Sequence, residues 1–458
     1  MRNRFTNFRR GLTLAVLFAI GSLAARAQSV GVGTTTPAAS AALDVTSTTG
    51  GMLLPRMTAT KRAAIPNPVQ GLFVFQTDGT PGLYYYVGNS WVNVVNGLVP
   101  DVDGNAGANP AILVSTLAGS GTAGYVNDRG TAAQFFNPTG VTVDGSGAVY
   151  VADKQNHLIR KITAMGEVTT LAGPDIRTVN FGGGGGPGYV DGPSSVARFN
   201  NPIGVAVDRN GIVYVADAGN HCIRIVTAMG MVSTLAGSGT AGNADGMGTA
   251  AQFNVPMGVA LGGSGAVYVA DTGNHCIRTI TTAGMVSTLA GSGTAGFANG
   301  TGPVARFDTP TGVVVYSGRI YVADQGNCCI RKIMLPGGEV STLAGSGSPS
   351  NAFHMPNTGL TAGYADGTGA AAQFNYPSGV AVDTYENVYV ADTGNNNIRK
   401  ITPMGVVSTL AGRGTAGFAN GTGPVAQFNG PAGVAVYAPR AGTVYVADTN
   451  NNRIQVIK

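Results

Sequence analysis

Val267-Tyr268-Val269-Ala270-Asp271 belongs to a pattern that recurs along most of this 458-residue chain. Its Tyr-Val-Ala-Asp core occurs six times, beginning at Tyr150, Tyr214, Tyr268, Tyr321, Tyr389 and Tyr445. Each copy is followed at a fixed distance by an asparagine and then an isoleucine, and successive copies lie 53 to 68 residues apart. Self-similarity of this kind indicates that the chain repeats one supersecondary unit.

The third repeat shows the plan of one unit. Four runs of strand-forming residues, separated by turn residues, lie at 232–237, 256–259, 268–271 and 276–280. Short strands joined by tight turns predict an antiparallel meander, and six meanders packed radially form a propeller. We therefore predict an all-β fold, in which a six-bladed β-propeller of four-stranded blades occupies residues 112–458 after a small, mainly β module.

Glycine and phenylalanine recur at positions that packing explains. A glycine stands two residues after the proline that opens the innermost strand of each unit, where the chain is crowded. A phenylalanine precedes each of these prolines by three residues and is expected to fill the space between blades: Phe135, Phe199, Phe253, Phe307, Phe374 and Phe428. The last repeat lacks an outer strand, so we expect the spare strand at 113–119 to pair with it and close the ring.

The first 111 residues are predicted to form three segments. Residues 1–27 have the features of a secretory signal, because arginines precede an apolar run and Ala25-Arg26-Ala27 fits the cleavage rule. A twin-arginine signal is the alternative. Residues 28–96 are expected to form a module with a helix at 58–65 and strands at 42–45, 72–75, 83–86 and from Trp91. Residues 97–111 are rich in turn-forming residues and are predicted to be a linker.

Two regions resemble known families. Residues 202–208, 213–217 and 220–224, with their equivalents in the other units, resemble NHL repeats. The resemblance spans residues 112–458 and implies a six-bladed propeller used mainly as an interaction surface, although a few relatives are lyases or bind RNA. Within the N-terminal module, residues 32–37, 42–45, 53–57 and 71–74 resemble a module that begins many exported bacterial surface and tail-fibre-like proteins.

Charge gives no support for a nucleic-acid partner. Cleavage after residue 27 would remove five arginines and no acidic residue, so Lys plus Arg would fall from 27 to match the 22 Asp plus Glu. A net charge near zero lacks the basic surface that nucleic-acid binding requires. Apart from residues 12–25, which are too few to span a bilayer comfortably, no segment is long and apolar enough for a membrane span.

The four cysteines are expected to be buried thiols. Cys222, Cys276 and Cys329 occupy the same position in successive repeats, so they should lie too far apart to bridge. A strained bridge between Cys328 and Cys329 is the alternative.

Two sets of polar residues recur once per blade. An arginine follows the aspartate of each Tyr-Val-Ala-Asp by seven residues, except that Gln455 replaces it in the sixth blade. We interpret these residues as pairs that tie the blade together, with a ring of arginines that binds anions as the alternative. His157, His221 and His275 share another position, but repeat equivalence places them on an arc, so we predict no metal site.

The sequence predicts neither a catalytic residue nor a cofactor. The innermost strands are apolar apart from their ends, and no unrepeated pair of carboxylates suits acid–base catalysis. We therefore predict an exported, non-catalytic interaction scaffold for a protein or glycan partner, located extracellularly, at the cell surface or in the periplasm. Oligomerisation through the N-terminal module is a further expectation. The alternative function is a propeller-type lyase or hydrolase with a metal in the central channel.

Two connections between blades are longer than the others. Those from Gly173 to Phe199 and from Gly345 to Phe374 exceed the common length by ten and thirteen residues and belong to opposite blades, two and five. Binding residues often lie on loops carried by a rigid scaffold, although long surface loops also arise by drift at little cost in stability. We predict binding residues in these loops: Arg177, Asn180, Phe181, Phe353, His354 and Met355.

Overall fold

The computed structural model of the chain divides into two compact units, residues 1–109 and 110–458, which are described separately. The residues described are 30–32, 43–45, 54–69, 71–78, 81–87, 90–93, 112–174, 186–347, 363–437 and 442–458. None of the helices in these ranges has the length and apolar character needed to cross a bilayer.

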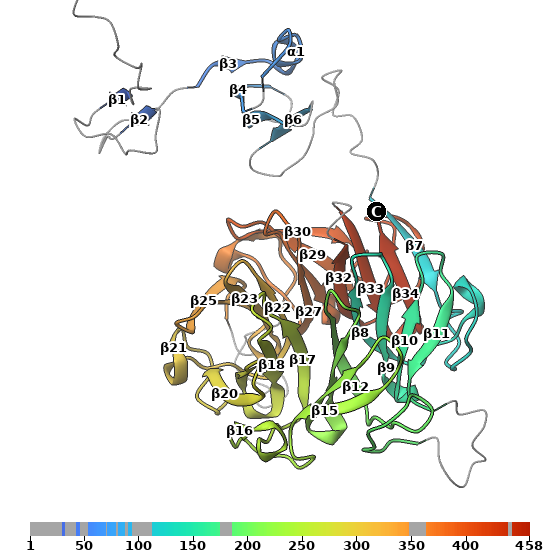
Figure 1. Cartoon of the computed structure of the whole chain (residues 1–458). Coiled ribbons are helices and arrows are strands. Elements are labelled where there is room, and N and C mark those ends of the chain that lie inside the picture. Colours follow the sequence, from blue (N-terminus) through green and yellow to red (C-terminus); the bar gives the residue numbers. More distant parts are fainter. Residues whose placement is uncertain are drawn as a thin grey trace, which may run out of the picture. The chain divides into compact units, whose positions relative to one another are not determined.

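The second unit is the predicted six-bladed propeller (Figure 1). Innermost strands begin at the repeated prolines: β8 (Pro138–Val143), β12 (Pro202–Val207), β17 (Pro256–Leu261), β22 (Pro310–Tyr316), β27 (Pro377–Val382) and β32 (Pro431–Tyr437). Second strands end with the Tyr-Val-Ala-Asp pattern: β9 (Val149–Asp153), β13 (Val213–Asp217), β18 (Val267–Asp271), β23 (Arg319–Asp324), β28 (Val388–Asp392) and β33 (Thr443–Asp448). Third strands follow a short 3-10 turn: β10 (Leu158–Ile162), β14 (Cys222–Val226), β19 (Cys276–Ile280), β24 (Cys329–Met334), β29 (Asn397–Ile401) and β34 (Arg453–Ile457).

Ring closure occurs as predicted. Five blades take their outer strand from the same repeat: β11 (Val168–Ala172), β15 (Val232–Ala236), β20 (Met285–Ala290), β25 (Glu339–Ala344) and β30 (Val406–Ala411). The sixth blade takes β7 (Leu113–Ala118), which pairs antiparallel with β34 and places Val114 opposite Ile457. The first and last strands of the propeller therefore lie in one sheet.

Four blades contain one strand more than predicted. Two-residue strands extend their outer edges: β16 (Gly246–Met247), β21 (Gly300–Thr301), β26 (Gly367–Thr368) and β31 (Gly421–Thr422). Each belongs to the connection that enters the blade and pairs with that blade's outer strand, as Gly246 does with Val286. Single bridges at Arg129 and Gly192 mark the same crossing in blades one and two. A pair of residues carries too little periodicity to be predicted as a strand.

The innermost strands contact one another in order around the ring, and β32 returns to β8 (Figure 1). The repeated glycines lie where neighbouring innermost strands approach each other most closely. A Cβ added to Gly140 would overlap the carbonyl oxygen of Ile203 in the next blade, and the equivalent glycine of every blade faces the same obstacle. The prediction that crowding requires glycine here is confirmed.

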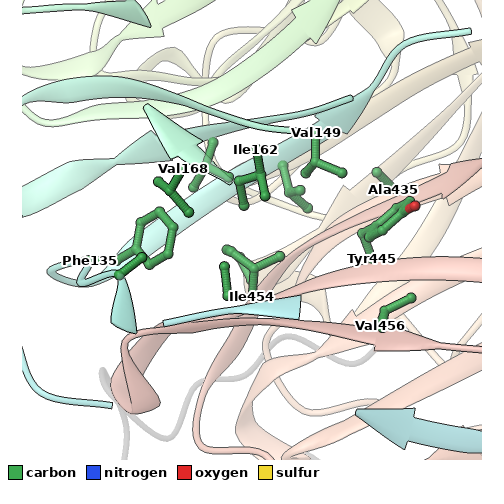
Figure 2. Close-up of a cluster of buried hydrophobic side chains, with 13 residues drawn as sticks. Phe135, Val149, Ile162, Val168, Ala435, Tyr445, Ile454 and Val456 are labelled. Carbon is green, nitrogen blue, oxygen red and sulfur yellow. The ribbon is translucent and has the colours of Figure 1, made fainter. Parts of the chain in front are cut away.

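Six apolar clusters fill the six interfaces between blades. Figure 2 shows the interface between blades one and six, where Phe135 lies with Val149 and Ile162 of the first blade and Ile454 of the last. All six predicted phenylalanines are almost completely buried. Burial of an aromatic side chain at each interface stabilises the ring by roughly 2–3 kcal/mol per residue.

The first unit contains a parallel pair, β1 (Val30–Val32) and β2 (Leu43–Val45), and a four-stranded sheet. The sheet comprises β3 (Arg56–Met57), β4 (Phe73–Gln76), β5 (Gly82–Val87) and β6 (Ser90–Asn93). Helix α1 (Ala59–Ala63) begins after Thr58, whose hydroxyl accepts a hydrogen bond from the Lys61 amide. Val74, Tyr84 and Trp91 form its buried apolar cluster. Helix α1 and strands β2, β4, β5 and β6 agree with the predicted helix and strands, whereas β1 and β3 were not predicted.

Candidate functional site

One face of the propeller carries the connections between blades. In each meander the innermost strand begins where the second and outer strands end, because neighbouring strands are antiparallel. The 3-10 turns after the second strands and the connections between blades therefore share this side. We call it the loop face.

The repeated arginines are fully buried within the blades rather than exposed as a ring. Arg160 Nη1 lies 2.7 Å from Asp153 Oδ2, and the corresponding pairs at Arg224, Arg278, Arg331 and Arg399 measure 2.7–2.9 Å with no exposed side-chain surface. The predicted Asp–Arg pairing is confirmed. Gln455, which replaces arginine in the sixth blade, donates to Asp448 at 3.4 Å.

Each arginine also holds the connection that enters its blade. Arg160 donates to the carbonyl oxygens of Gln134 and Val126 and, at 2.7 Å, to the Asn127 side chain. An aspartate or asparagine takes the place of Asn127 at the other arginines: Asp191, Asp245, Asn299 and Asp366. The sequence interpretation missed this second partner, although the recurring Asp or Asn ahead of each phenylalanine was a visible signal.

The buried aspartates are structural acceptors. Asp153 accepts hydrogen bonds from the Phe136 amide and the Asn156 side chain as well as from Arg160. Burial raises the pKa of Asp153 to about 6, against the opposing effects of Arg160, Asn156 and the Phe136 amide. The carboxylate is consequently ionised at neutral pH and already satisfied by its neighbours.

The three repeated histidines lie in separate blades, and each accepts a hydrogen bond from the next blade. We call this hydrogen bond between blades a latch. Each has a left-handed backbone conformation, and its Nδ1 accepts the amide hydrogen of Asn201, Val255 or Thr309 at 3.0–3.1 Å. Asn396 and Asn452 perform the same task with their side-chain oxygens. Within the described ranges no group of three or more His, Cys, Asp or Glu side chains is placed to hold a metal ion.

All four cysteines are buried thiols, as predicted. Burial raises the pKa of Cys276 to about 12 and that of Cys222 still further. Thiols with such pKa values remain protonated at neutral pH and are poor nucleophiles.

A cavity of about 240 Å³ occupies the centre of the ring and is lined by the innermost strands. Its walls are glycines and valines from every blade, with Thr139, Thr311 and Ser378 as polar contributors. Lys154 and Gln325, on the 3-10 turns of blades one and four, also line it and place it towards the loop face. At the equivalent position three blades have a threonine that bonds to the next blade: Thr272, Thr393 and Thr449. Lys154 and Gln325 are thus departures from the repeat that the sequence interpretation did not single out.

The six predicted binding residues lie outside the described residues. The long connections containing them leave the described chain after residues 174 and 347 and return at residues 186 and 363. The ends at residues 174 and 347 directly follow the outer strands β11 and β25, so they belong to the loop face.

Comparison with known proteins identifies both regions of the chain. The family model of the NHL repeat matches residues 135–162, 199–226, 253–280, 307–333, 374–401 and 428–457. The model of a phage tail like trimerisation region matches residues 31–109.

Curated relatives are found in animals and plants. NHL repeat-containing protein 2 of Bos taurus is 32% identical over 354 residues, which are 70% of this chain and 46% of the relative. Protein SUPPRESSOR OF QUENCHING 1, chloroplastic, of Arabidopsis thaliana is 34% identical over 290 residues, 61% of this chain and 27% of the relative. The chain spans less than half the length of either protein.

A solved structure shares the fold. The auxiliary nutrient binding protein of Bacteroides thetaiotaomicron VPI-5482 superposes with a TM-score of 0.55 at 16% identity, covering 83% of each chain. The chain is therefore an NHL-repeat protein, homologous to NHL repeat-containing proteins: six repeats form its β-propeller, and residues 31–109 match a phage tail like trimerisation region.

Proposed function

We propose that this protein is an exported, non-catalytic binding scaffold that presents the loop face of its propeller to a protein or glycan partner. One observation carries the proposal. The aspartate repeated in all six blades and the arginine repeated in five are buried. Arg160 and Asp153 show that they bond to their own scaffold. Residues that differ between blades, such as Lys154 and Gln325, instead lie on the loop face and line the cavity there.

The two long connections are proposed to supply the specificity of binding. Their described ends lie on the loop face of opposite blades. Within them we propose the binding residues Arg177, Asn180, Phe181, Phe353, His354 and Met355. Aromatic, guanidinium and amide groups of this kind are typical of binding loops.

Export and oligomerisation complete the proposal. Residues 1–27 have the composition of a secretory signal, and residues 31–109 match a trimerisation region of phage tail-like proteins. A trimer would present three loop faces, so that weak individual contacts would combine into stronger attachment. One structural neighbour is an auxiliary nutrient binding protein, and a binding role of that kind is compatible with the proposal.

The experiment must separate binding from turnover. Purified full-length protein is applied to arrays of glycans and of bacterial surface proteins, and every captured ligand is eluted and analysed by mass spectrometry. We expect saturable binding, recovery of the ligand unchanged, and the same affinity with and without EDTA. A ligand that is cleaved or modified in proportion to protein and time would overturn the proposal in favour of the metal-dependent lyase or hydrolase.

A further inference from the structure

We propose that the outer edge of the propeller, beside the outer strands, binds a neutral polysaccharide through aromatic side chains that recur at one position of the repeat. The inference rests on the proposed binding function and specifies its ligand class. The position is aromatic in five blades: Tyr125, Tyr189, Phe297, Tyr364 and Phe418. In the first five blades it lies two residues before the Asp or Asn that contacts the buried arginine. Asn243 occupies it in blade three.

Four of these rings are substantially exposed. Tyr189, Phe297, Tyr364 and Phe418 have 43%, 40%, 53% and 40% of their surface accessible, and we call them the rim aromatics. Large aromatic side chains usually lose most of their accessible surface on folding. Four such exceptions at one equivalent position of the repeat are available to a partner.

Each rim aromatic is held in place by an arginine. The guanidinium carbon of Arg224 lies 5.0 Å from the Tyr189 ring centroid. Arg331 and Arg399 stand 4.7 and 4.9 Å from Phe297 and Tyr364, and Arg453 stands 3.6 Å from Phe418. A ring fixed by a cation–π contact loses little freedom when a ligand stacks on it.

The rim aromatics are not needed to bury the repeated arginines. In blade three, where Asn243 replaces the aromatic residue, the Arg278 side chain is as completely buried as the other repeated arginines. The scaffold therefore forms without an aromatic residue at this position. Exposed rings that the fold does not require are candidates for binding.

Hydrogen-bonding groups stand beside the rings. Asp191 and Asp366, two residues beyond Tyr189 and Tyr364, keep about half of their side-chain surface exposed, at 48% and 51%. Tyr364 also shares a hydrogen bond of 2.7 Å with Thr409, whose hydroxyl lies 3.2 Å from Asp366. The corresponding groups of blade two, Tyr189 and Thr234, are 3.2 Å apart.

The chemistry of this surface matches a sugar ring. A pyranose presents a flat C–H face and a circumference of hydroxyl groups, which suit an aromatic face and neighbouring carboxylate, amide and hydroxyl groups respectively.

Charge favours a neutral ligand. Each repeated arginine is paired with one buried aspartate, and the second partner is either an uncharged asparagine, as in blade four, or another aspartate, as in blade five. A blade's cluster is therefore neutral or carries one negative charge. Nucleic acids also stack on aromatic rings, but their binding requires a positively charged groove.

The test uses full-length protein and three neutral polysaccharides: a soluble β-glucan, a mannan and a xylan. Retardation in native gels containing each polysaccharide measures affinity. The fourfold variant Tyr189→Asn, Phe297→Asn, Tyr364→Asn and Phe418→Asn copies the residue that blade three already has, so it should fold. We expect at least one polysaccharide to retard the wild type, and the fourfold variant to lose at least about tenfold in affinity, because several weak contacts act together.

The matched control is Asn243→Tyr, which completes the rim and should strengthen retardation. Should the fourfold variant unfold, the single variant Tyr364→Asn and the gain from Asn243→Tyr decide the question. The inference is overturned if no neutral polysaccharide retards the wild type, or if a folded fourfold variant binds as tightly as the wild type. Capture of an unmodified protein ligand would then leave the scaffold function standing, whereas chemical conversion of a ligand would contradict that function separately.

Discussion

At the residue scale, the repeated arginine connects the parts of each of the first five blades. Arg331 joins the second strand through Asp324, at 2.7 Å, and the entering connection through Asn299, at 2.8 Å. Its side chain has no exposed surface, so its charge is stabilised by these partners and by the carbonyl oxygens of Arg306 and Ala298 rather than by water. The sixth blade shows that glutamine can replace the arginine, because Gln455 donates to Asp448 there.

Replacement of Arg331 by methionine should lower the free energy of unfolding by ~3–5 kcal/mol, because Asp324 would remain buried without its cation. Arg331→Gln should cost at least ~1 kcal/mol less, because an amide donor still reaches the carboxylate. Denaturant unfolding of both variants measures the difference. Equal stability of the two variants would show that the ion pair is not what holds this cluster together.

The hydrogen bond that His157 accepts should make stability depend on pH. Burial lowers the pKa of His157 from its usual 6.5, and its Nδ1 must stay unprotonated to accept the Asn201 amide. The folded chain therefore binds the proton less readily than the unfolded chain. Stability from the latch is complete above pH 6.5 and is lost as the pH falls through the lowered pKa.

His157→Asn provides the matched test, because Asn396 and Asn452 make the same bond in other blades. Variant and wild type should have similar melting temperatures at pH 8, and the variant should melt higher at pH 5. His157→Ala should cost ~1 kcal/mol at pH 8, because the Asn201 amide loses its acceptor. A melting-temperature difference between His157→Asn and wild type that does not change with pH would refute the latch mechanism.

At this scale the sequence predicted the Asp–Arg pairs but not the other residues that contact them. Asp153 and Arg160 were paired because an aspartate and an arginine recur together once per blade, as residues that could tie a blade's loop to its neighbouring strand. Asn127 lies 33 residues from Arg160, on a connection without regular periodicity, and only the folded chain shows that contact. The histidines were separated correctly by repeat equivalence, while their bonds to the next blade depend on a left-handed backbone that the sequence did not reveal.

At the scale of the element, the innermost strands determine how tightly the ring can close. Gly258 faces the carbonyl oxygen of Thr311 so closely that any side chain would displace the neighbouring strand. Gly263, in the turn that follows the same strand, has open space around it. Substituting these two glycines therefore distinguishes the cost of a side chain at a close approach between strands from the general effect of replacing a glycine.

Gly258→Ala should lower the free energy of unfolding by ~2 kcal/mol or more, because the strand must shift against a packed neighbour. Gly263→Ala should be nearly neutral, or stabilising by up to ~1 kcal/mol through the unfolded state. Thermal unfolding of the two variants makes the comparison. Equal effects at both positions would mean that the innermost strands have room to adjust.

The strands could be predicted where the run of strand-forming residues was long enough to recognise. The four main strands of each blade follow from runs of alternating residues bounded by glycine, proline and aspartate. The two-residue strands β16, β21, β26 and β31 depend on where a connection crosses the outer strand, which is a tertiary property. That crossing is also what places the rim aromatics beside the buried arginines.

At the scale of the whole molecule, two units of different character are joined in one chain. The propeller closes on itself through β7 and β34, and the N-terminal unit matches a trimerisation region. Deletion of residues 28–96 should convert a trimer into a monomer without lowering the melting temperature of the propeller. Light scattering coupled to size-exclusion chromatography measures the mass, and a trimer that survives the deletion would place the contacts elsewhere.

The central claim is that binding belongs to the loop face and above all to its two long connections. The most direct measurement is the affinity of a variant in which both connections are shortened to the length found in the other four. For a ligand identified on the arrays, calorimetric titration should show loss of binding in this variant, with its melting temperature unchanged. An unchanged affinity in the folded double variant would contradict the account and place the site elsewhere on the protein.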